Sequence, residues 1–540
     1  MHEPRGTGKY LVAAAWALWP IFLLWVSYET RFWINNDTIG SLDCARQLRT
    51  LALERAVNPY WGFGFAFLLS LLPLEGAGSW LQIHLLTGLL VIGGQVFLYL
   101  ALTRLRIRSS LAGALSLAWG ASNYASGGAL FLTSDPLLGF LGSIYLFLFI
   151  KSAPEIFAPK KAWPLGLVHA LAALTKTAAF FTLFFLPLVL SVQELLRGGP
   201  GSSLKNRAVR LATFNLFYLL PIFIIFSLWG AAVTAKYERF ALWEAGIYNY
   251  ARYVRGSENL ALAEDLARHQ VPRDGTYWWS DIAGSLSGWD HRAYFDRRDQ
   301  VACLKRNLTY IWFGPGLACG AALLALLLVS WLGSPLLAKQ GEGSREIALI
   351  TASAALGIFL TYSLVHLLPR FLPFAAIFAL PGCGLLLERV FRGRQKFGKI
   401  LSVTFLSLAI LHGVGAMAYA SLMLAPGGEH FALAREISAR KIPGKAPGPL
   451  GAFLASDGFM YHHAVLAYLL RLRTGEIRPA SPDGCRYTAT FRPHLVLLVF
   501  PAGDPAPVKI EVDARTFERV SSCIWGKRDR RTLLAVYQDN

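Results

Sequence analysis

The sequence has little charge and little cysteine. Only 16% of its 540 residues are charged, against roughly 25% in an ordinary soluble domain, while 54% are hydrophobic. This apolar excess is more than one globular core needs, so lipid must be much of the solvent. Six cysteines in so long a chain do not make a disulfide framework. Cys44 and Cys303 stay open as bridge partners, and Cys485 with Cys523 is the favoured pair.

The chain also lacks the motifs of soluble catalytic domains. It has no Walker loop, no dinucleotide-binding glycine fingerprint, no His-Glu-x-x-His and no Cys-x-x-Cys pair. Its net charge of +19 suggests a nucleic-acid partner in a soluble protein. Here, however, Lys and Arg cluster in short loops between apolar runs. We therefore attribute the charge to membrane topology and expect no nucleic-acid partner.

Long apolar runs are what the sequence has instead. Runs of about 18 residues or more indicate membrane-spanning helices, because backbone amides in hydrocarbon must pair within their own segment. The sequence therefore predicts an α-helical polytopic membrane protein. About eleven spanning helices are expected, near residues 10–28, 80–103, 109–123, 136–151, 163–178, 180–196, 211–234, 308–332, 347–367, 371–388 and 400–422.

The basic loops predict the orientation of these helices. Lys and Arg concentrate in cytoplasmic loops. The N-terminus is then cytoplasmic, and the long segments at 29–79, 235–307 and 423–540 emerge on the other face. The basic clusters that the predicted spans place together lie at 104–108, 160–161, 205–210 and 392–399.

The chain divides into two predicted domains. Residues 1–422 form the transmembrane domain, and residues 423–540 form a small extracytoplasmic α/β domain. The second domain is inferred from strand-like runs at 451–455, 494–500 and 532–537 and from a helical stretch at 464–472.

The first outer segment, 29–79, predicts two helices at the membrane surface. Apolar residues from Ile39 to Ala52 recur at helical spacing, with charged residues on the other face. A second apolar stretch, 63–72, is too short to span, so we expect it to lie along the membrane surface or dip into it. Asp37 is placed near the start of the first helix, where a carboxylate caps exposed amides.

The outer segment at 235–307 is rich in aromatic residues among balanced charges, which predicts a segment folded over the membrane surface. Aromatic side chains in such a place either anchor at the interface or stack on sugar rings, and anchoring is the more ordinary role. They are Tyr248, Tyr250, Tyr253, Tyr277, Trp278, Trp279, Trp289 and Tyr294.

Four ionisable residues lie at span ends or in outer loops: Asp37, Asp135, Lys176 and Arg370. An ionised side chain that reaches mid-bilayer costs on the order of 3 kcal/mol, so each is a candidate functional residue. Each also has an ordinary explanation. The acids can cap helices, Lys176 can snorkel from a span end, and Arg370 can mark an interface or a turn. Two acids and two bases on one predicted face together favour a site.

Several features along the chain form one pattern. They are an acidic first outer loop before two interfacial helices, an acidic loop at 133–136, a Leu-Thr-Lys segment at 174–176, a Pro-Arg-Phe-Leu-Pro segment at 369–373 and a soluble C-terminal domain. This pattern resembles the GT-C superfamily of membrane glycosyltransferases, closest to the protein O-mannosyltransferase and lipid A aminoarabinose transferase branch. One departure is the first loop, where those mannosyltransferases carry an Asp-Glu pair and this chain has Asp37 with Asp43 further on.

The resemblance implies an enzyme that transfers a sugar, with inversion, from a polyprenyl-phosphate donor to a lipid, glycan or protein acceptor on the extracytoplasmic face. Asp37 would be the general base, with Asp43 as its substitute. Asp135 would orient the acceptor, take over as base, or hold a divalent metal together with Asp37; no other cofactor is implied. Lys176 and Arg370 would bind the lipid phosphate. The expected location is the plasma membrane of a bacterium.

Two other interpretations stay open. A surface-polysaccharide polymerase or ligase shares the lipid-linked donor and depends on a large outer loop rich in Arg and His. A non-catalytic transporter or scaffold predicts broken spans with polar residues near mid-bilayer, whereas the acids here lie at the starts of outer loops. The residues that keep the first alternative open are Arg252, Arg255, Arg268, His269, Arg273 and His291.

Overall fold

The structure is a computed structural model of the 540-residue chain. It describes residues 7–31, 36–74, 77–122, 132–196, 203–240, 242, 244–270, 272, 276, 278–286, 296–313, 342–365, 372–392, parts of 400–418, 428–439, 450–454, 474–476, 478–480, 486–489, 493, 495–501, 507, 509–513, 515–525 and 532–539.

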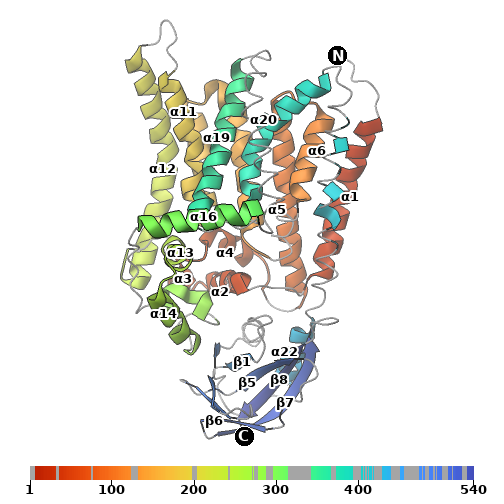
Figure 1. The fold of residues 1–540 in the computed structure, drawn as a ribbon, viewed down its shortest axis with the longest axis vertical. Coiled ribbons are helices and arrows are strands. Elements are labelled where there is room, and N and C mark those ends of the chain that lie inside the picture. Colours follow the sequence, from red (N-terminus) through yellow and green to blue (C-terminus); the bar gives the residue numbers. More distant parts are fainter. Residues whose placement is uncertain are drawn as a thin grey trace.

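Long apolar helices form the main body of the molecule (Figure 1). Within the described residues, seven helical segments are long and apolar enough to cross a membrane. The protein is an integral membrane protein. The helices of the bundle are α1 (Thr7–Glu29), α5 (Ala77–Arg104), α6 (Ser109–Gly120), α8 (Asp135–Ser152), α9 (Pro159–Thr175), α10 (Ala178–Leu183), α11 (Phe185–Leu196), α12 (Leu204–Tyr237), α19 (Glu342–Val365) and α20 (Leu372–Arg392).

The seven apolar segments correspond to seven of the predicted spans. The spans predicted at 109–123 and 163–178 are helices of 12 and 17 residues, α6 and α9, which are shorter than the other seven.

Two predicted spans are not described as such. The one at 308–332 begins inside α16 (Arg297–Phe313), which lies across the bundle in Figure 1 because its charged first turn is too polar to enter it. The rest of that span, and most of 400–422, falls in parts of the chain that the structure does not describe.

Short helices lie at the end of the bundle nearer the sheet (Figure 1). The two helices predicted in the first outer segment are present as α2 and α4. Helix α4 buries Phe65 and Leu69 against α2, which contributes Ile39 and Leu42 to the same core. The short elements are α2 (Asn36–Arg49), α3 (Leu53–Ala56), α4 (Phe63–Ser70), α13 (Glu244–Asn249), a π-helix (Tyr250–Arg255), α14 (Glu258–Arg268), a 3-10 helix (Trp278–Asp281) and α15 (Ile282–Ser285).

The C-terminal part forms one mixed sheet with the strand order β2-β1-β5-β8-β7-β6-β4-β3. Strand β1 runs parallel to β2 and β5, and β4 runs parallel to β6, while the other neighbours are antiparallel. Helix α22 (Gly428–Ala439) packs against β7. The strands are β1 (Leu450–Leu454), β2 (Thr474–Glu476), β3 (Arg478–Pro479), β4 (Arg486–Thr488), β5 (Leu495–Pro501), β6 (Lys509–Val512), β7 (Arg515–Trp525) and β8 (Thr532–Asp539).

The three predicted strands are β1, β5 and β8, while the helix predicted at 464–472 falls in a stretch that the structure does not describe. Strand β7 was not predicted. Its register shifts between Arg519 and Ser521, so the alternation of side chains that marks a strand is broken there.

Three of the cysteines that the structure describes are free thiols. Cys44 and Cys303, which were open as bridge partners, are free and buried, as is Cys383. The favoured partner Cys485 has no described position.

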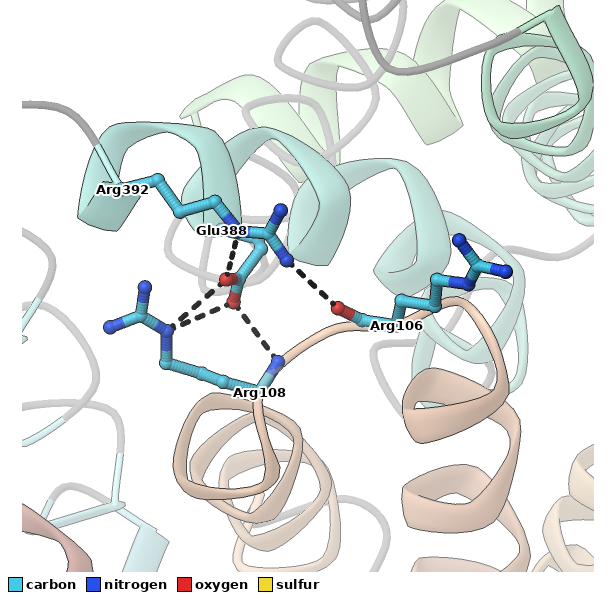
Figure 2. Close-up of polar contacts among 4 residues, drawn as sticks. All are labelled: Arg106, Arg108, Glu388 and Arg392. Carbon is cyan, nitrogen blue, oxygen red and sulfur yellow. Dashed lines mark hydrogen bonds and ion pairs between the residues drawn. The ribbon is translucent and has the colours of Figure 1, made fainter. Parts of the chain in front are cut away.

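The opposite end of the bundle brings two of the predicted basic loops together. Glu388 of α20 is buried and accepts hydrogen bonds from the backbone N–H of Arg108 (3.0 Å), from Nε of Arg108 (3.2 Å) and from Nε of Arg392 (2.8 Å). Nη2 of Arg392 also donates to the backbone oxygen of Arg106 (3.5 Å). Figure 2 shows these contacts, which tie the turn between α5 and α6 to the end of α20.

A buried polar chain crosses the middle of the bundle. Tyr145 of α8 and Tyr218 of α12 join their hydroxyls at 2.9 Å, and the Tyr218 hydroxyl lies 2.7 Å from Nδ1 of His169. Nε2 of His169 lies 2.9 Å from the backbone oxygen of Phe180, which can only accept, so this nitrogen carries the proton. Each of these polar side chains therefore has a hydrogen-bond partner, and the contact between His169 and Phe180 joins α9 to α10.

Candidate functional site

Two of the predicted site residues form an ion pair at the sheet-side end of the bundle. Nζ of Lys176 contacts Oδ1 of Asp135, and the two side chains are 21% and 11% exposed. The other carboxylate oxygen of Asp135 accepts a hydrogen bond from Oγ1 of Thr133 at 3.0 Å. Both oxygens of Asp135 are thus engaged, and the lysine is held at the start of α8.

The chain around Lys176 is shaped by a break in the helix. Helix α9 ends at Thr175, Lys176 is extended, and α10 begins two residues later. The start of α4 packs directly onto this break. A Cβ at Gly62 would lie 1.9 Å from the backbone oxygen of Thr175, and one at Gly64 would lie 2.6 Å from its side-chain oxygen. Only glycine permits this approach, so the first outer segment supports the backbone that presents Lys176.

Asp37 lies in the first turn of α2 and is joined to the same region through its neighbour. Oγ1 of Thr38 donates a hydrogen bond to the backbone oxygen of Leu132 at 2.9 Å, three residues before Asp135. Oδ1 of Asp37 itself accepts a hydrogen bond from the indole Nε1 of Trp279 at 3.3 Å. Segments around residues 37, 135 and 176 are therefore connected by direct contacts.

Asp43 takes a different position from the other acids. It is buried, and its carboxylate accepts hydrogen bonds from the backbone N–H of Thr276 (2.7 Å), from Oγ1 of Thr276 (2.7 Å) and from Oγ of Ser280 (2.6 Å). Burial raises the pKa of Asp43, against the opposing charge of Arg46 and these hydrogen bonds. These contacts join the outer segment 235–307 to α2, so the role of Asp43 here is to hold the two segments together.

Aromatic rings pack around this fastening. Tyr60 meets Trp61, Tyr248 and Trp279 with ring centroids 4.8 to 5.6 Å apart and edge-to-face geometry. Nε1 of Trp61 donates to the backbone oxygen of Trp279 at 2.9 Å. Tyr248 is only 1% exposed. Tyr248 therefore lies inside the protein, and interfacial anchoring, the more ordinary expectation, does not describe it.

Three of the cations that favoured a polymerase lie beside acids of the same outer segment. Arg252 pairs with Glu264 at 2.7 Å and Arg255 with Asp299 at 3.4 Å. His269 lies 3.6 Å from a carboxylate oxygen of Asp265. Two further cations that favoured a polymerase, Arg273 and His291, are in stretches without a described position.

Arg370 also lies outside the described residues, in the stretch between α19 and α20. Among the residues that the structure describes, no group of three or more His, Cys, Asp or Glu side chains is arranged to hold a metal ion. Asp135 is engaged by Lys176 and Thr133.

Sequence reasoning missed the contact partners that assemble the site. Gly62 and Gly64 carry no chemical signal, because they act through close backbone approach. Thr38 acts through its hydroxyl, which contacts a backbone oxygen distant in sequence. Trp279 was found only as one aromatic residue among several, since its contact with Asp37 joins positions 242 residues apart.

No protein-family model matches the sequence, and no curated protein matches it. Among solved structures, the chain is similar to ArnT from Cupriavidus metallidurans bound to undecaprenyl phosphate, with 16% identity, 98% of each chain covered and a TM-score of 0.46. It is similar to the archaeal oligosaccharyltransferase AglB from Archaeoglobus fulgidus in complex with an inhibitory peptide and a dolichol-phosphate, with 13% identity, 86% of this chain and 64% of that chain covered, and a TM-score of 0.45.

The chain is also similar to the S. cerevisiae protein O-mannosyltransferase complex bound to the sugar donor, with 13% identity and a TM-score of 0.32. That match covers 48% of this chain and 38% of the other, so this chain spans well under half of the mannosyltransferase chain. These three proteins are members of the GT-C superfamily, the superfamily that the sequence resembles.

Proposed function

We propose that the protein is a membrane glycosyltransferase that moves a sugar from a polyprenyl-phosphate donor to an acceptor at the sheet-side end of the bundle. The observation that carries the proposal is the meeting of three chain-distant segments, around Asp37, Asp135 and Lys176. They supply carboxylates and an ammonium group at the end of an apolar helical bundle. An apolar bundle with a charged end suits a donor that has a long apolar tail and a phosphate.

Asp37 is the proposed general base. Its carboxylate takes the proton from the acceptor nucleophile as that nucleophile bonds to the anomeric carbon and the bond from that carbon to the lipid phosphate breaks. Attack from the face opposite the leaving phosphate inverts the anomeric configuration. Trp279 holds one oxygen of Asp37 through its indole N–H, which leaves the carboxylate oriented for this step.

Lys176 is proposed to stabilise the departing lipid phosphate. The phosphate gains negative charge as the bond breaks, and a cation in a site with little water stabilises that charge strongly. An ammonium group has three donors, so contact with Asp135 leaves others for the phosphate. Arg370 is proposed as a second phosphate-binding cation from its place in the sequence. No step of this scheme passes through a metal.

Asp135 is proposed to position Lys176 and to orient the acceptor. Asp43 is the less suitable base, because its carboxylate is buried and already accepts three hydrogen bonds. From the basic loops, we infer that the sheet-side end is extracytoplasmic and that the membrane is a bacterial plasma membrane. The sheet and the outer segment 235–307 would then supply contacts for a lipid, glycan or protein acceptor.

The experiment uses full-length protein in nanodiscs and a panel of polyprenyl-phosphate sugars, with release of polyprenyl phosphate as the readout. Nucleotide sugars carrying the same sugars are run in parallel. We expect turnover of at least one lipid-linked donor and of no nucleotide sugar. The same protein with Lys176→Met should lose most of that turnover.

The matched control is Lys160→Met, which removes an exposed lysine, 75% accessible, at the opposite end of the bundle. It should turn over the donor as the wild type does. If no lipid-linked donor is consumed while the protein stays folded, the proposed function is wrong. Equal losses in both lysine variants would remove Lys176 from the mechanism.

A further inference from the structure

An apolar groove lies between α1, α5 and α6 at the end of the bundle opposite to Lys176. Its volume is about 280 Å³. Nε1 of Trp16 donates to the backbone oxygen of Gly113 at 3.0 Å, and Trp16 meets Tyr99 edge-on with ring centroids 6.1 Å apart, so the walls are fastened together. The lining residues are Val12, Ala13, Trp16, Val96, Tyr99, Ser109, Ser110 and Gly113.

Two serines of this groove mark one end of it. Ser109 and Ser110 are the first two residues of α6, where the backbone N–H groups of a helix have no partner within the helix. Hydroxyls and first-turn amides together favour an oxygen-rich anion. The groove is thus apolar along its length and suited to an anion at its head.

One arginine, Arg108, is the residue before the first serine of that head. It contacts the buried Glu388 only through its backbone N–H and Nε. Figure 2 shows the two terminal nitrogens of Arg108 pointing away from Glu388, and the guanidinium group of Arg106 pointing away as well. Nη1 of Arg389 is buried and has no hydrogen-bond partner among the described residues. Glu388 is the single carboxylate that pairs with two guanidinium groups here, those of Arg108 and Arg392.

The turn that carries these arginines is conformationally costly. Arg106 has a φ of 60°, in the left-handed region that side chains other than glycine rarely adopt. A glycine would relieve the turn but would remove a cation. Strain of this kind is retained where a side chain has a task, and a guanidinium group is well matched to a phosphate.

We propose that this end of the bundle binds one anionic phospholipid. Its phosphate lies at the start of α6 beside Arg108, and one of its acyl chains lies in the groove. The proposal is independent of the glycosyltransferase assignment, because the groove and Lys176 are at opposite ends of the bundle. The apolar lining is what favours a lipid over a free phosphate.

The experiment is native mass spectrometry of delipidated full-length protein with phosphatidylglycerol and with phosphatidylcholine of the same acyl chains. We expect about tenfold tighter binding of the anionic lipid, as for a few basic residues at a membrane surface. Glycerol phosphate is added as a competitor. It should leave lipid binding unchanged, and displacement of the lipid by it would show a free-phosphate site and overturn the proposal.

Two variants locate the lipid. The double variant Arg108→Gln/Glu388→Gln removes both members of an ion pair, so that no buried carboxylate is left unpaired. It should abolish most of the preference for phosphatidylglycerol. Its control, Lys160→Gln/Glu155→Gln, removes an exposed ion pair with 3.8 Å between nitrogen and oxygen and should keep the preference.

The groove is tested by Ala13→Phe, which fills it, against Leu18→Phe on the exposed face of the same helix. Ala13→Phe should weaken phosphatidylglycerol binding several-fold and Leu18→Phe should not. Equal binding of the two lipids by the wild type, or equal effects of a variant and its control, would overturn the proposal.

Discussion

The two ends of the helical bundle use buried ion pairs differently. At the sheet-side end, Lys176 meets a single acid, Asp135, and the pair is balanced. At the other end, Glu388 is shared by Arg108 and Arg392, whose side chains are 34% and 58% exposed, so positive charge is in excess. Both pairs join segments distant in sequence. The balanced pair beside a helix break suits chemistry, whereas the cation-rich cluster suits the binding of an anion.

Mutations at the two ends of the bundle should also differ in their effects on folding and on binding. Lys176 is mostly enclosed and lies beside a break in a helix, where an ionised side chain is unfavourable without a partner. Its contact with Asp135 supplies that partner. The side chains of Arg108 and Arg392 at the opposite end stay partly exposed, so losing one of them should affect binding more than folding. Variants at the two ends should therefore give different signatures.

The largest expected effect belongs to Asp37 at the sheet-side end. Asp37→Asn removes the proposed base while keeping size and shape, and loss of a general base lowers turnover by about 10² to 10⁴-fold. Donor turnover by purified protein in nanodiscs measures it. The control is Asp299→Asn on α16, whose half-exposed carboxylate pairs with Arg255, and it should be near wild type. Full turnover by Asp37→Asn would move the base elsewhere.

A change at the opposite end should affect stability and leave turnover alone. Glu388→Gln removes the charge that joins α20 to the turn before α6, and we expect about 2 kcal/mol of destabilisation, as for hydrogen bonds to a charged group. Thermal unfolding in detergent measures it. Glu155→Gln, at a 61% exposed glutamate, should leave the melting temperature unchanged. A large loss of turnover in Glu388→Gln would break the separation between the ends.

The pH dependence of stability should reveal a third acid at the sheet-side end. Burial raises the pKa of Glu244 to about 7, with Asp281 adding to the shift and Arg239 opposing it. The folded state therefore favours the protonated form. The stability that this provides is complete below about pH 4.5, the ordinary pKa of the group, and is lost as the pH rises through 7.

Melting temperatures between pH 5 and pH 8 test this expectation for wild type and Glu244→Gln. The variant should show a smaller decline with rising pH, worth about 1 to 3 kcal/mol at the alkaline end. Glu258→Gln, at an exposed glutamate of the same outer segment, should decline as the wild type does. Parallel curves for all three proteins would show that Glu244 does not titrate in this range.

The smallest expected effect belongs to Trp279. Trp279→Phe keeps a ring in the aromatic cluster but removes the N–H that contacts Asp37, so we expect a few-fold loss of kcat with little change in KM. The control is Trp229→Phe, which replaces a tryptophan of α12 whose ring lies beside that of Phe63 of α4. An unchanged kcat in Trp279→Phe, or the same loss in both variants, would remove Trp279 from the positioning of Asp37.

Much of the bundle was predictable, because a spanning helix leaves a long apolar run that needs no partner to be recognised. The span predicted at 308–332 was started too early, inside α16, because the apolar residues at the end of that helix continue into a longer apolar run. Strand β7 was missed because its bulge interrupts the alternation of side chains. Both errors arise where a local pattern is overridden by position in the fold.

Candidate residues were predictable from chemistry, but their contacts were not. Asp135 and Lys176 stand out because charge is rare near span ends, and the structure joins them. Asp43 and Asp37 look alike in sequence, six residues apart on one helix. Only the packing of Thr276 and Ser280 distinguishes the buried acid from the one near Trp279, and that packing depends on a segment more than 200 residues away.

A double-mutant cycle on kcat/KM for a lipid-linked donor tests most directly whether Asp135 and Lys176 act as one centre. The proteins are wild type, Asp135→Asn, Lys176→Met and the double variant, each checked for folding by its melting temperature. Because the two groups are in contact, we predict that kcat/KM of the double variant is no lower than that of the less active single variant. Losses that multiply would show that the two residues act independently and would contradict the shared centre.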